Sequence, residues 1–377
     1  MNRKQIFYII LISSVILFRQ ISLGQDSTKI TSPKGITPET TTITKDVLIT
    51  GMWYIGYAAR DLNGLKENEF FLRRGYLTFK TKITDQLVAR LTQDITIDRE
   101  GDGIGDVELR IKYAYLNYQH YDIWIFTKPN VEFGIVHRPW LVFEQHVNDY
   151  RVQGQLFLER IGLLSSADFG VTFSTLLGGE MDKDYQTSVN KAFPGKYGSI
   201  SFGIYNGGGY NELENNVNKN FEGRFSIRPL PFVIPGLQFS YLNAFGSGNT
   251  PEAPEYLLHS GMLSYESWLL ALTWTIFTGV GNQSGKAVDE NGNSVDHSGY
   301  SAFLEFRIPY TRLRLVSRYD YLKIQFPKPV ESRTLITGIA YAFTNGSKIL
   351  IDYDLHDETD DPRTPAKQAE LMVEVRF

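Results

Sequence analysis

The charged residues of this chain are confined to one face of its extended segments, and this constrains the fold more than any other feature. Eight segments of roughly 9 to 13 residues alternate apolar and polar side chains: 74–83, 86–98, 107–115, 221–228, 300–308, 312–321, 347–355 and 369–377. They hold 24 Lys, Arg, Asp and Glu residues, and within each segment the residue numbers of all of these are either all even or all odd. Successive side chains of a strand point to opposite faces, so each segment is predicted to be a strand with one ionic and one apolar face.

Segment 107–115 illustrates the pattern. Its even positions are ionic and its odd positions apolar: Glu108, Arg110 and Lys112 against Val107, Leu109, Ile111, Tyr113 and Tyr115. Two protein classes produce such alternation. In a soluble β-sandwich or barrel the apolar face is the core, whereas in a membrane barrel the apolar face meets lipid and the charges line a wet lumen. Parity alone does not separate these classes.

The connections between segments favour the membrane barrel. Alternate connections are long and polar: 61–69, 99–106, 140–160, 208–219, 247–256, 282–297, 323–331 and 357–368. Between them lie tight turns at 84–85, 266–267, 310–311 and 345–346, although 119–130 and 178–195 are longer than this scheme requires. Long loops at one end and short turns at the other are typical of outer-membrane barrels. The prediction is an all-β, transmembrane, antiparallel up-and-down β-barrel of about 16 strands.

The N-terminus indicates export. Arg3 and Lys4 precede an apolar stretch over 6–18, and Ser22-Leu23-Gly24 offers a cleavage site of small residues. A signal anchor is the alternative, but this stretch is shorter than the ~20 residues that span a bilayer. We therefore expect a signal peptide at 1–24, a flexible Thr- and Ser-rich segment at 25–45, and an outer-membrane barrel at 46–377.

The C-terminus supports the same location. The last predicted strand, 369–377, ends on Phe377. A terminal strand ending in Phe resembles the signal that the barrel insertion machinery of Gram-negative bacteria reads. Expected partners are that machinery, membrane lipid and lipopolysaccharide.

Composition excludes several other functions. The net charge is −4, and loss of a leader with three bases makes the mature chain more acidic, so no nucleic-acid partner is expected. There is no cysteine, and the six histidines show no metal-ligand spacing, so neither a metal nor a cofactor is predicted. A GxSxG nucleophile elbow is also absent, and we expect no enzyme.

Short motifs across most of 46–377 resemble the phosphate-selective porin O and P family of Gram-negative bacteria. They are 71–77, 131–134 followed by Arg138-Pro139, 158–160, 168–171, 203–207 and 219–224. This resemblance implies a 16-stranded barrel, commonly a homotrimer, whose third loop folds inward to narrow the pore. By strand order that loop is 140–160. The constriction residues implied at and beside it are Arg138, Glu144, His146, Asp149, Arg151 and Arg160.

The resemblance implies phosphate selectivity through stacked lumen arginines and a lysine cluster at the constriction, but loop 140–160 has no lysine. The ionic faces of the eight segments carry 14 bases and 10 acids. The predicted pore-lining bases are Arg74, Lys80, Lys82, Arg90, Arg110, Lys112, Arg224, Arg228, Arg307, Arg314 and Arg318. The hypothesis is a porin for passive diffusion of small hydrophilic solutes, favouring anions such as phosphate. The alternative is a non-conducting structural or surface-binding barrel.

Overall fold

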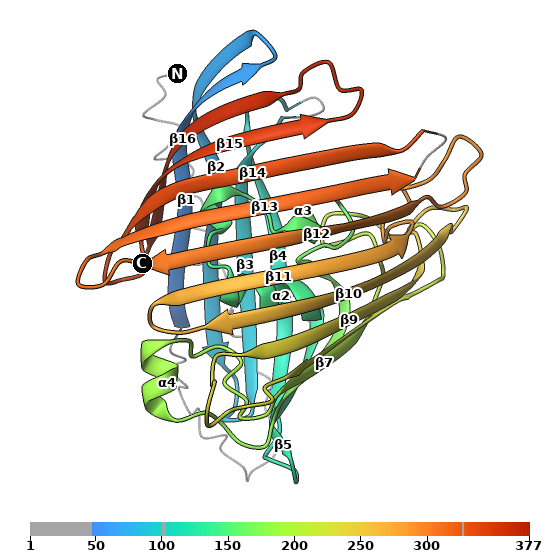
Figure 1. The fold of residues 1–377 in the computed structure, drawn as a ribbon. Helices are drawn as coiled ribbons and strands as arrows, with labels where there is room; N and C mark the ends of the chain where they lie inside the picture. The colour runs from blue at the N-terminus through green and yellow to red at the C-terminus, as the bar shows by residue number, and fades with distance from the viewer. Residues whose placement is uncertain (1–46, 100–102, 326–327) are drawn as a thin grey trace, which may run out of the picture. The chain divides into compact units, whose positions relative to one another are not determined.

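The described residues, 47–99, 103–325 and 328–377 of the computed structural model, form a closed antiparallel barrel (Figure 1). Each strand pairs with its neighbours in sequence, and β1 pairs with β16 to close the ring. The strands are β1 (Val47–Leu62), β2 (Leu65–Lys82), β3 (Leu87–Ile97), β4 (Val107–Gln119), β5 (Phe126–His137), β6 (Ala167–Leu177), β7 (Gly198–Tyr205), β8 (Asn220–Ile227), β9 (Gln238–Ser247), β10 (Glu255–Glu266), β11 (Leu270–Val280), β12 (Asp296–Arg307), β13 (Leu313–Gln325), β14 (Val330–Ala342), β15 (Lys348–Glu358) and β16 (Ala366–Arg376). The predicted barrel of about sixteen strands is confirmed. The predicted signal peptide, 1–24, and segment 25–45 lie outside the described residues.

The two ends of the described barrel meet at a glycine. The Gly51 amide donates to the Phe377 carbonyl at 2.9 Å, and the Phe377 amide donates to the Gly51 carbonyl at 3.1 Å. A Cβ at Gly51 would stand 2.1 Å from the Phe377 ring. The Phe377 ring thus packs over the backbone of Gly51, and the two backbone hydrogen bonds make Phe377 part of the closure.

The ionic faces of the strands point into the barrel and the apolar faces point out. Asp94, Glu222 and Arg224 are at most 1% exposed, whereas Leu109 and Ile351 are 55% and 56% exposed. A soluble barrel has the reverse arrangement, with its apolar face enclosed. An apolar exterior around a charged interior is the arrangement of a barrel surrounded by lipid.

The prediction of a long loop at 61–69 is wrong. β1 and β2 continue through this region and are joined by a tight turn at Asn63 and Gly64, whose φ angles are +53° and +98°. Asn-Gly is the preferred pair for a two-residue hairpin, because both positions require positive φ. The charges of this stretch suggested a loop, but the turn chemistry of these two residues decides the structure.

The face predicted for Tyr113 and Tyr115 is also wrong. Thr92 of β3 pairs with Tyr113, but the next residue, Gln93, pairs with Ile111, so Lys112 is an extra residue in β4. Such a β-bulge reverses the alternation beyond it. Lys112 points inward as predicted, and Tyr113 and Tyr115 are buried on the inner face with it.

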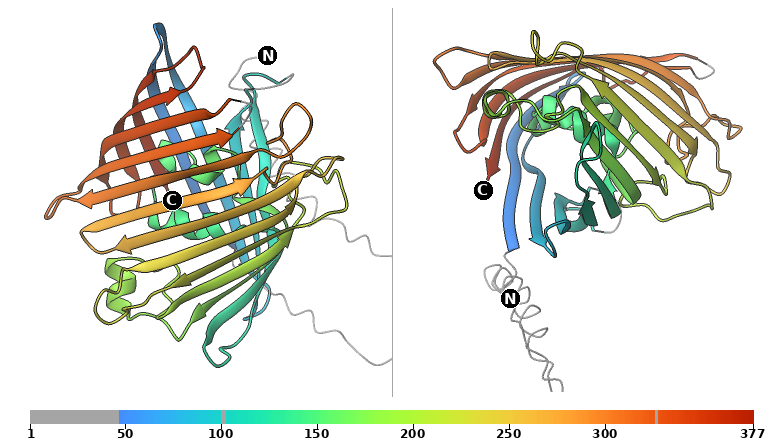
Figure 2. Two further views of the ribbon diagram at one scale, coloured as in Figure 1. Left: turned by 45° about the vertical axis from the view of Figure 1, so that its right-hand side comes forward. Right: turned by 90° about the horizontal axis from the view of Figure 1, so that it is seen from below.

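The connections differ between the two ends of the barrel. We call the end with the tight turns, such as 343–347, the turn end, and the opposite end the loop end. The longest loop-end connection, 138–166, holds α2 (Pro139–Val147), η1 (Arg151–Gln153) and α3 (Phe157–Arg160), and Figure 2 shows these helices inside the ring of strands. At the turn end, 178–197 carries α4 (Lys183–Ser188). Among the described residues, no helix is both long and apolar enough to cross a membrane.

Candidate functional site

Connection 138–166 contains the predicted constriction loop, 140–160, and we call the whole connection the constriction loop. It packs against the wall made by β9, β10 and β11. Pro139 occupies the first turn of α2, where its missing N–H removes no helical hydrogen bond. The loop buries an apolar set that packs with apolar side chains of the wall: Trp140, Leu141, Phe143, Phe157 and Leu158 against Leu242, Tyr256, Leu258, Met262 and Phe277. Each large side chain buried in this way contributes about 1.5–3 kcal/mol. This part of the lumen is therefore filled.

Arg138 anchors the start of the loop. Its guanidinium donates to Glu222 Oε2 at 2.6 Å and to Asp168 Oδ2 at 3.1 Å, and its Cζ lies 4.2 Å from the Tyr205 ring centroid. Glu222 also accepts from the Trp140 amide at 2.8 Å. Arg138 is fully buried. It was predicted among the constriction residues, and the structure places it beneath the loop, away from the cavities.

Ion pairs tie the opposite side of the loop to β13, β15 and β16. Asp149 accepts from Lys348 Nζ at 3.0 Å and from Arg376 at 2.6 Å. Arg160 pairs with Asp320 of β13. Burial opposes ionisation of Asp149, but the two cations outweigh it and lower the pKa of this carboxyl. The loop is thus held to two separate parts of the wall.

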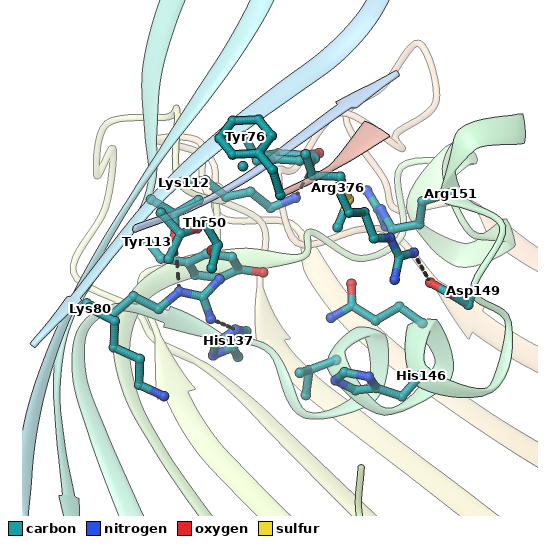
Figure 3. A pocket seen from close by; sticks show the side chains of 18 of the residues that line it. Thr50, Tyr76, Lys80, Lys112, Tyr113, His137, His146, Asp149, Arg151 and Arg376 are labelled. Atoms are coloured by element: carbon teal, nitrogen blue, oxygen red, sulfur yellow. Dashed lines mark hydrogen bonds and ion pairs between the residues drawn. The ribbon is translucent and has the colours of Figure 1, made fainter. Parts of the chain in front are cut away.

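Among the cavities lined by the described residues, two lie one on each side of the loop and share part of their lining, and another of about 450 Å³ lies between α3 and β13 to β16. The turn-side cavity has a volume of about 820 Å³, and its lining includes Lys80, Arg90 and His137 (Figure 3). The loop-side cavity has a volume of about 450 Å³, and its lining includes Arg74 and Arg318. Four residues line both cavities: Tyr54, Tyr76, Lys112 and Arg151. These four residues, the junction, are where a path between the two cavities would pass.

Basic side chains dominate both linings. The turn-side cavity has five Lys and Arg residues against one carboxylate: Lys80, Arg90, Lys112, Arg151 and Arg376 against Asp149. The loop-side cavity has seven against two: Arg73, Arg74, Arg99, Lys112, Arg151, Arg160 and Arg318 against Glu159 and Asp354. Figure 3 shows Lys80 and Lys112 on the side opposite Asp149 and Arg376.

Three of these bases, Lys80, Arg90 and Lys112, have no carboxylate within 4 Å among the described residues. We call them the cationic wall. Lys112 Nζ donates to the Tyr76 hydroxyl at 3.3 Å and lies 4.7 Å from the centroid of that ring. Arg90 Cζ lies 4.7 Å from the Tyr113 centroid. These cations are supported by aromatic rings, which do not neutralise their charge.

Lys80 and Arg90 are directly opposite each other on β2 and β3. Like charges in this position destabilise a sheet. Neither has a carboxylate within 4 Å among the described residues, so the pair places two positive charges side by side on the inner face.

The charge at the junction is reduced by one carboxylate. Arg151 donates to Glu159 Oε2 at 2.5 Å. Burial opposes ionisation of Glu159, but Arg151 and Lys112 outweigh it and hold its pKa at about 2. Glu159 therefore stays ionised beside Arg151 and Lys112, so these two bases and one carboxylate leave one net positive charge at the junction.

The predicted pore-lining bases separate into four groups. Lys80, Arg90 and Lys112 line the turn-side cavity, and Arg74, Lys112 and Arg318 line the loop-side cavity. Others are held in ion pairs along the wall: Arg110 with Glu108, and Arg307 and Arg314 with Glu305. Arg224 and Arg228 are buried inside the barrel under other segments, and Lys82 is exposed at the end of β2.

The predicted constriction residues also divide between cavity-lining and buried positions. His146, Asp149 and Arg151 line the turn-side cavity, and Arg151 and Arg160 line the loop-side cavity. Glu144 is buried and accepts from Trp140 Nε1 at 2.9 Å. Burial raises the pKa of its carboxyl to about 7.

The sequence reasoning missed the tyrosines of the junction. Tyr76 shares its parity with Arg74 and Lys80, so the alternation could have placed it on the inner face. Tyr54 lies in β1, outside the eight segments that were tested, and no signal in the sequence pointed to it.

Solved structures with a similar fold are outer-membrane proteins. OmpF of Salmonella typhi, solved in complex with daunomycin, gives a TM-score of 0.60 at 13% identity, covering 88% of this chain and 98% of that one. An anion-selective porin from Comamonas acidovorans gives 0.59 at 8% identity, covering 88% and 100%. The outer-membrane channel DcaP of Acinetobacter baumannii gives 0.58 at 12% identity, covering 88% and 97%.

At these identities the likeness establishes the barrel fold. No protein-family model matches the chain, and no curated protein matches its sequence.

Proposed function

We propose that this chain is an outer-membrane porin through which small hydrophilic solutes diffuse passively, with a preference for anions. The closed barrel with an apolar exterior and a charged interior supports a location in a membrane. The two cavities that share the junction support a path through the lumen. The similar folds of a porin and of an outer-membrane channel agree with this assignment.

The cationic wall carries the proposal of anion preference. Selectivity in a pore is set by the charges at its narrow part, where a low-dielectric wall strengthens their field. Here the junction holds Lys112 without a carboxylate, and Lys80 and Arg90 continue the positive field into the turn-side cavity. One protein of similar fold is itself described as an anion-selective porin.

Phosphate is among the anions proposed. The resemblance to the phosphate-selective porins implies lysines at the constriction, and the constriction loop lacks them between 140 and 160. The structure has two lysines near that level on the strands, Lys80 and Lys112. Lysine is a common phosphate-binding residue, and it can serve this purpose from a strand as well as from a loop.

The wider biological setting is also part of the proposal. We infer an exported chain whose leader, 1–24, is removed, and a barrel that contacts lipid and lipopolysaccharide, assembles as a homotrimer and has no enzymatic activity. Cell fractionation with gel mobility before and after boiling tests the location. A membrane barrel is expected in the outer-membrane fraction and to shift on boiling, and a soluble, unshifted protein would contradict the proposal.

Planar-bilayer recording of the purified barrel tests conduction. We expect discrete conductance steps in KCl. In a KCl gradient, the reversal potential should lie closer to the equilibrium potential of chloride than to that of potassium. A bilayer without steps would reject the pore, and a reversal potential on the cation side would reject the anion preference.

A non-conducting barrel is the second candidate. The lumen is filled from both ends, by the constriction loop and by part of 178–197, and a plugged barrel would share this feature. Swelling of liposomes in sugar solutions distinguishes the two candidates, because only an open pore lets the sugar enter.

A further inference from the structure

The turn-end connection 178–197 differs from the other connections at that end. It spans twenty residues and carries α4, whereas the connections 267–269 and 343–347 are tight turns. It also has its own backbone structure: Glu180 forms a bridge with Gly195, and the Met181 amide donates to the Pro194 carbonyl at 2.7 Å. We call residues 178–197 the buttress.

The buttress touches the constriction loop from the end of the barrel opposite to the loop's attachment. Asn190 Nδ2 donates to the His146 carbonyl at 2.9 Å and to Glu266 Oε1 of β10 at 2.7 Å. The Phe193 ring packs edge-to-face on Phe143 of α2, with centroids 5.2 Å apart, and lies 5.7 Å from the His146 ring. Both contacts are made to α2, the helix that borders the turn-side cavity.

A buried arginine joins the buttress, α2 and the barrel wall. Arg224 of β8 donates to the Pro139 carbonyl at 3.0 Å, and its Cζ lies 4.3 Å from the Phe143 centroid and 5.1 Å from the Phe193 centroid. It is 1% exposed and has no carboxylate within 4 Å among the described residues. A buried charge of this kind is costly unless other groups hold it. Here two rings, a carbonyl and serine hydroxyls hold it.

A second buried arginine holds the buttress itself. Arg228 donates to the Gly195 carbonyl at 3.2 Å and to the Tyr185 hydroxyl at 3.0 Å. Burial raises the pKa of Tyr185, so this hydroxyl stays neutral and accepts the bond. Two arginines predicted to line the pore are thus used to fix this segment.

The backbone at Phe193 is strained. Its φ is +47°, a region that bulky side chains rarely adopt. Such a conformation persists only where the surroundings enforce it, and it is concentrated at functional positions. The contacts that hold it here are those of the ring with Phe143, His146 and Arg224.

We propose that the buttress holds α2 in place from the turn end, and that Phe193 and Asn190 are positioning residues for the constriction. This inference rests on the proposed pore function for its consequence, the size and steadiness of the opening. Its structural claim, that the buttress immobilises α2, does not depend on conduction.

Spin labelling tests whether the buttress immobilises α2. Gln145 of α2 lines the turn-side cavity, and the chain has no cysteine, so Gln145→Cys gives a single labelling position. A nitroxide there should show a mainly immobile spectrum in the folded barrel. Phe193→Ala should raise the mobile fraction at least threefold, and Asn190→Ala should raise it less. Phe193→Tyr keeps the ring and should leave the spectrum unchanged.

Tyr197→Ala is the matched control, because it removes an aromatic ring from the same segment at a position that is 48% exposed. Every variant is first checked for the gel shift on boiling, which reports an intact barrel. Equal mobility in Phe193→Ala and in the parent would overturn the inference, and so would equal loosening by Tyr197→Ala.

Bilayer recording tests the consequence. In Phe193→Ala the rate of transitions to partly closed levels should rise at least fivefold, with Phe193→Tyr and Tyr197→Ala unchanged. A parent barrel that never conducts would count against the porin proposal, and the spin-label result would still decide the inference. A conducting parent with equally steady Phe193→Ala channels would contradict the role of the buttress.

Discussion

Two walls of the same lumen carry similar numbers of bases but differ in how these are neutralised. On the wall of β2, β3 and β4, Arg74 and Arg110 pair with Asp94 and Glu108. Three further bases of this wall, Lys80, Arg90 and Lys112, have no carboxylate within 4 Å among the described residues. On the wall of β12 to β16, bases are matched by acids: Arg307 and Arg314 by Glu305, Arg318 by Asp320, and Lys348 and Arg376 by Glu374. The comparison shows that a count of bases does not reveal which of them keep an unpaired charge.

The difference also determines where a solute would pass. The neutralised wall holds the tip of the constriction loop through Asp149 and Arg160, and the wall of β9 to β11 is covered by the apolar side of the loop. The turn-side cavity lies against the cationic wall, whereas a further cavity of about 450 Å³ lies against β13 to β16. Unpaired positive charge and the largest of these cavities therefore coincide on the side of β2 to β4.

Removing the cationic wall should have the largest effect. We expect Lys80→Gln, Arg90→Gln and Lys112→Gln together to abolish anion preference, moving the reversal potential in a KCl gradient to zero or to the cation side. The barrel should stay folded, because the change relieves the like-charge pair between β2 and β3. The matched control is Glu305→Gln with Arg307→Gln and Arg314→Gln, which removes a whole paired cluster from the other wall and makes the net charge only one unit more negative. An equal shift in the control would refute the distinction between the walls.

Lys112→Met alone should have the next largest effect. A single charge ~7 Å from a passing ion contributes roughly 0.6–2 kcal/mol at an effective dielectric constant between ~80 and ~20, or about threefold to thirtyfold in relative permeability. The anion-to-cation permeability ratio should fall within this range, with conductance retained. A ratio equal to that of the parent would show that the junction does not control selectivity.

Salt should weaken the preference by a smaller amount. The Debye length falls from about 10 Å at 0.1 M to about 3 Å at 1 M, so a field from unpaired wall charges is screened as KCl rises. The parent should lose anion preference across this range, whereas the triple variant should change little. A preference that is the same at both salt concentrations would point to steric selection.

A pH effect on the loop should be the smallest. Burial raises the pKa of Glu144 from 4.5 to about 7. Because its pKa is higher in the folded loop than in the unfolded chain, ionisation of this carboxyl destabilises the folded loop. The loop therefore loses stability as the pH rises from about 4.5 through about 7. Brief closures of the parent should therefore become several-fold more frequent between pH 5 and pH 8, and Glu144→Gln should remove this dependence. Parallel pH profiles would exclude Glu144 as the group responsible.

The faces of the strands could be predicted from the sequence because alternation is local. Residues such as Arg74 and Lys80 fix the inner face within one strand, without knowledge of any partner. The errors arose where local chemistry departs from the alternation. The Asn63-Gly64 turn was hidden in a charged stretch, and the bulge at Lys112 depends on how β4 pairs with β3.

The site could be predicted only in part, because its decisive property is pairing between distant residues. Arg160 meets Asp320, and Arg73 meets Glu370, across more than 150 positions of the chain. No local pattern shows which bases find such partners and which remain unpaired. For the same reason the sequence did not reveal that Arg224 and Arg228 are buried under α2 and the buttress.

The location of the path can be tested most directly with cysteines introduced on the two walls. Arg90→Cys lies in the turn-side cavity on the cationic wall, and Arg314→Cys is a similarly half-buried position on the neutralised wall. The chain has no other cysteine. A bulky thiol reagent added during bilayer recording should reduce the current through Arg90→Cys strongly and leave that through Arg314→Cys almost unchanged. Block at Arg314→Cys with none at Arg90→Cys would contradict a path along the cationic wall.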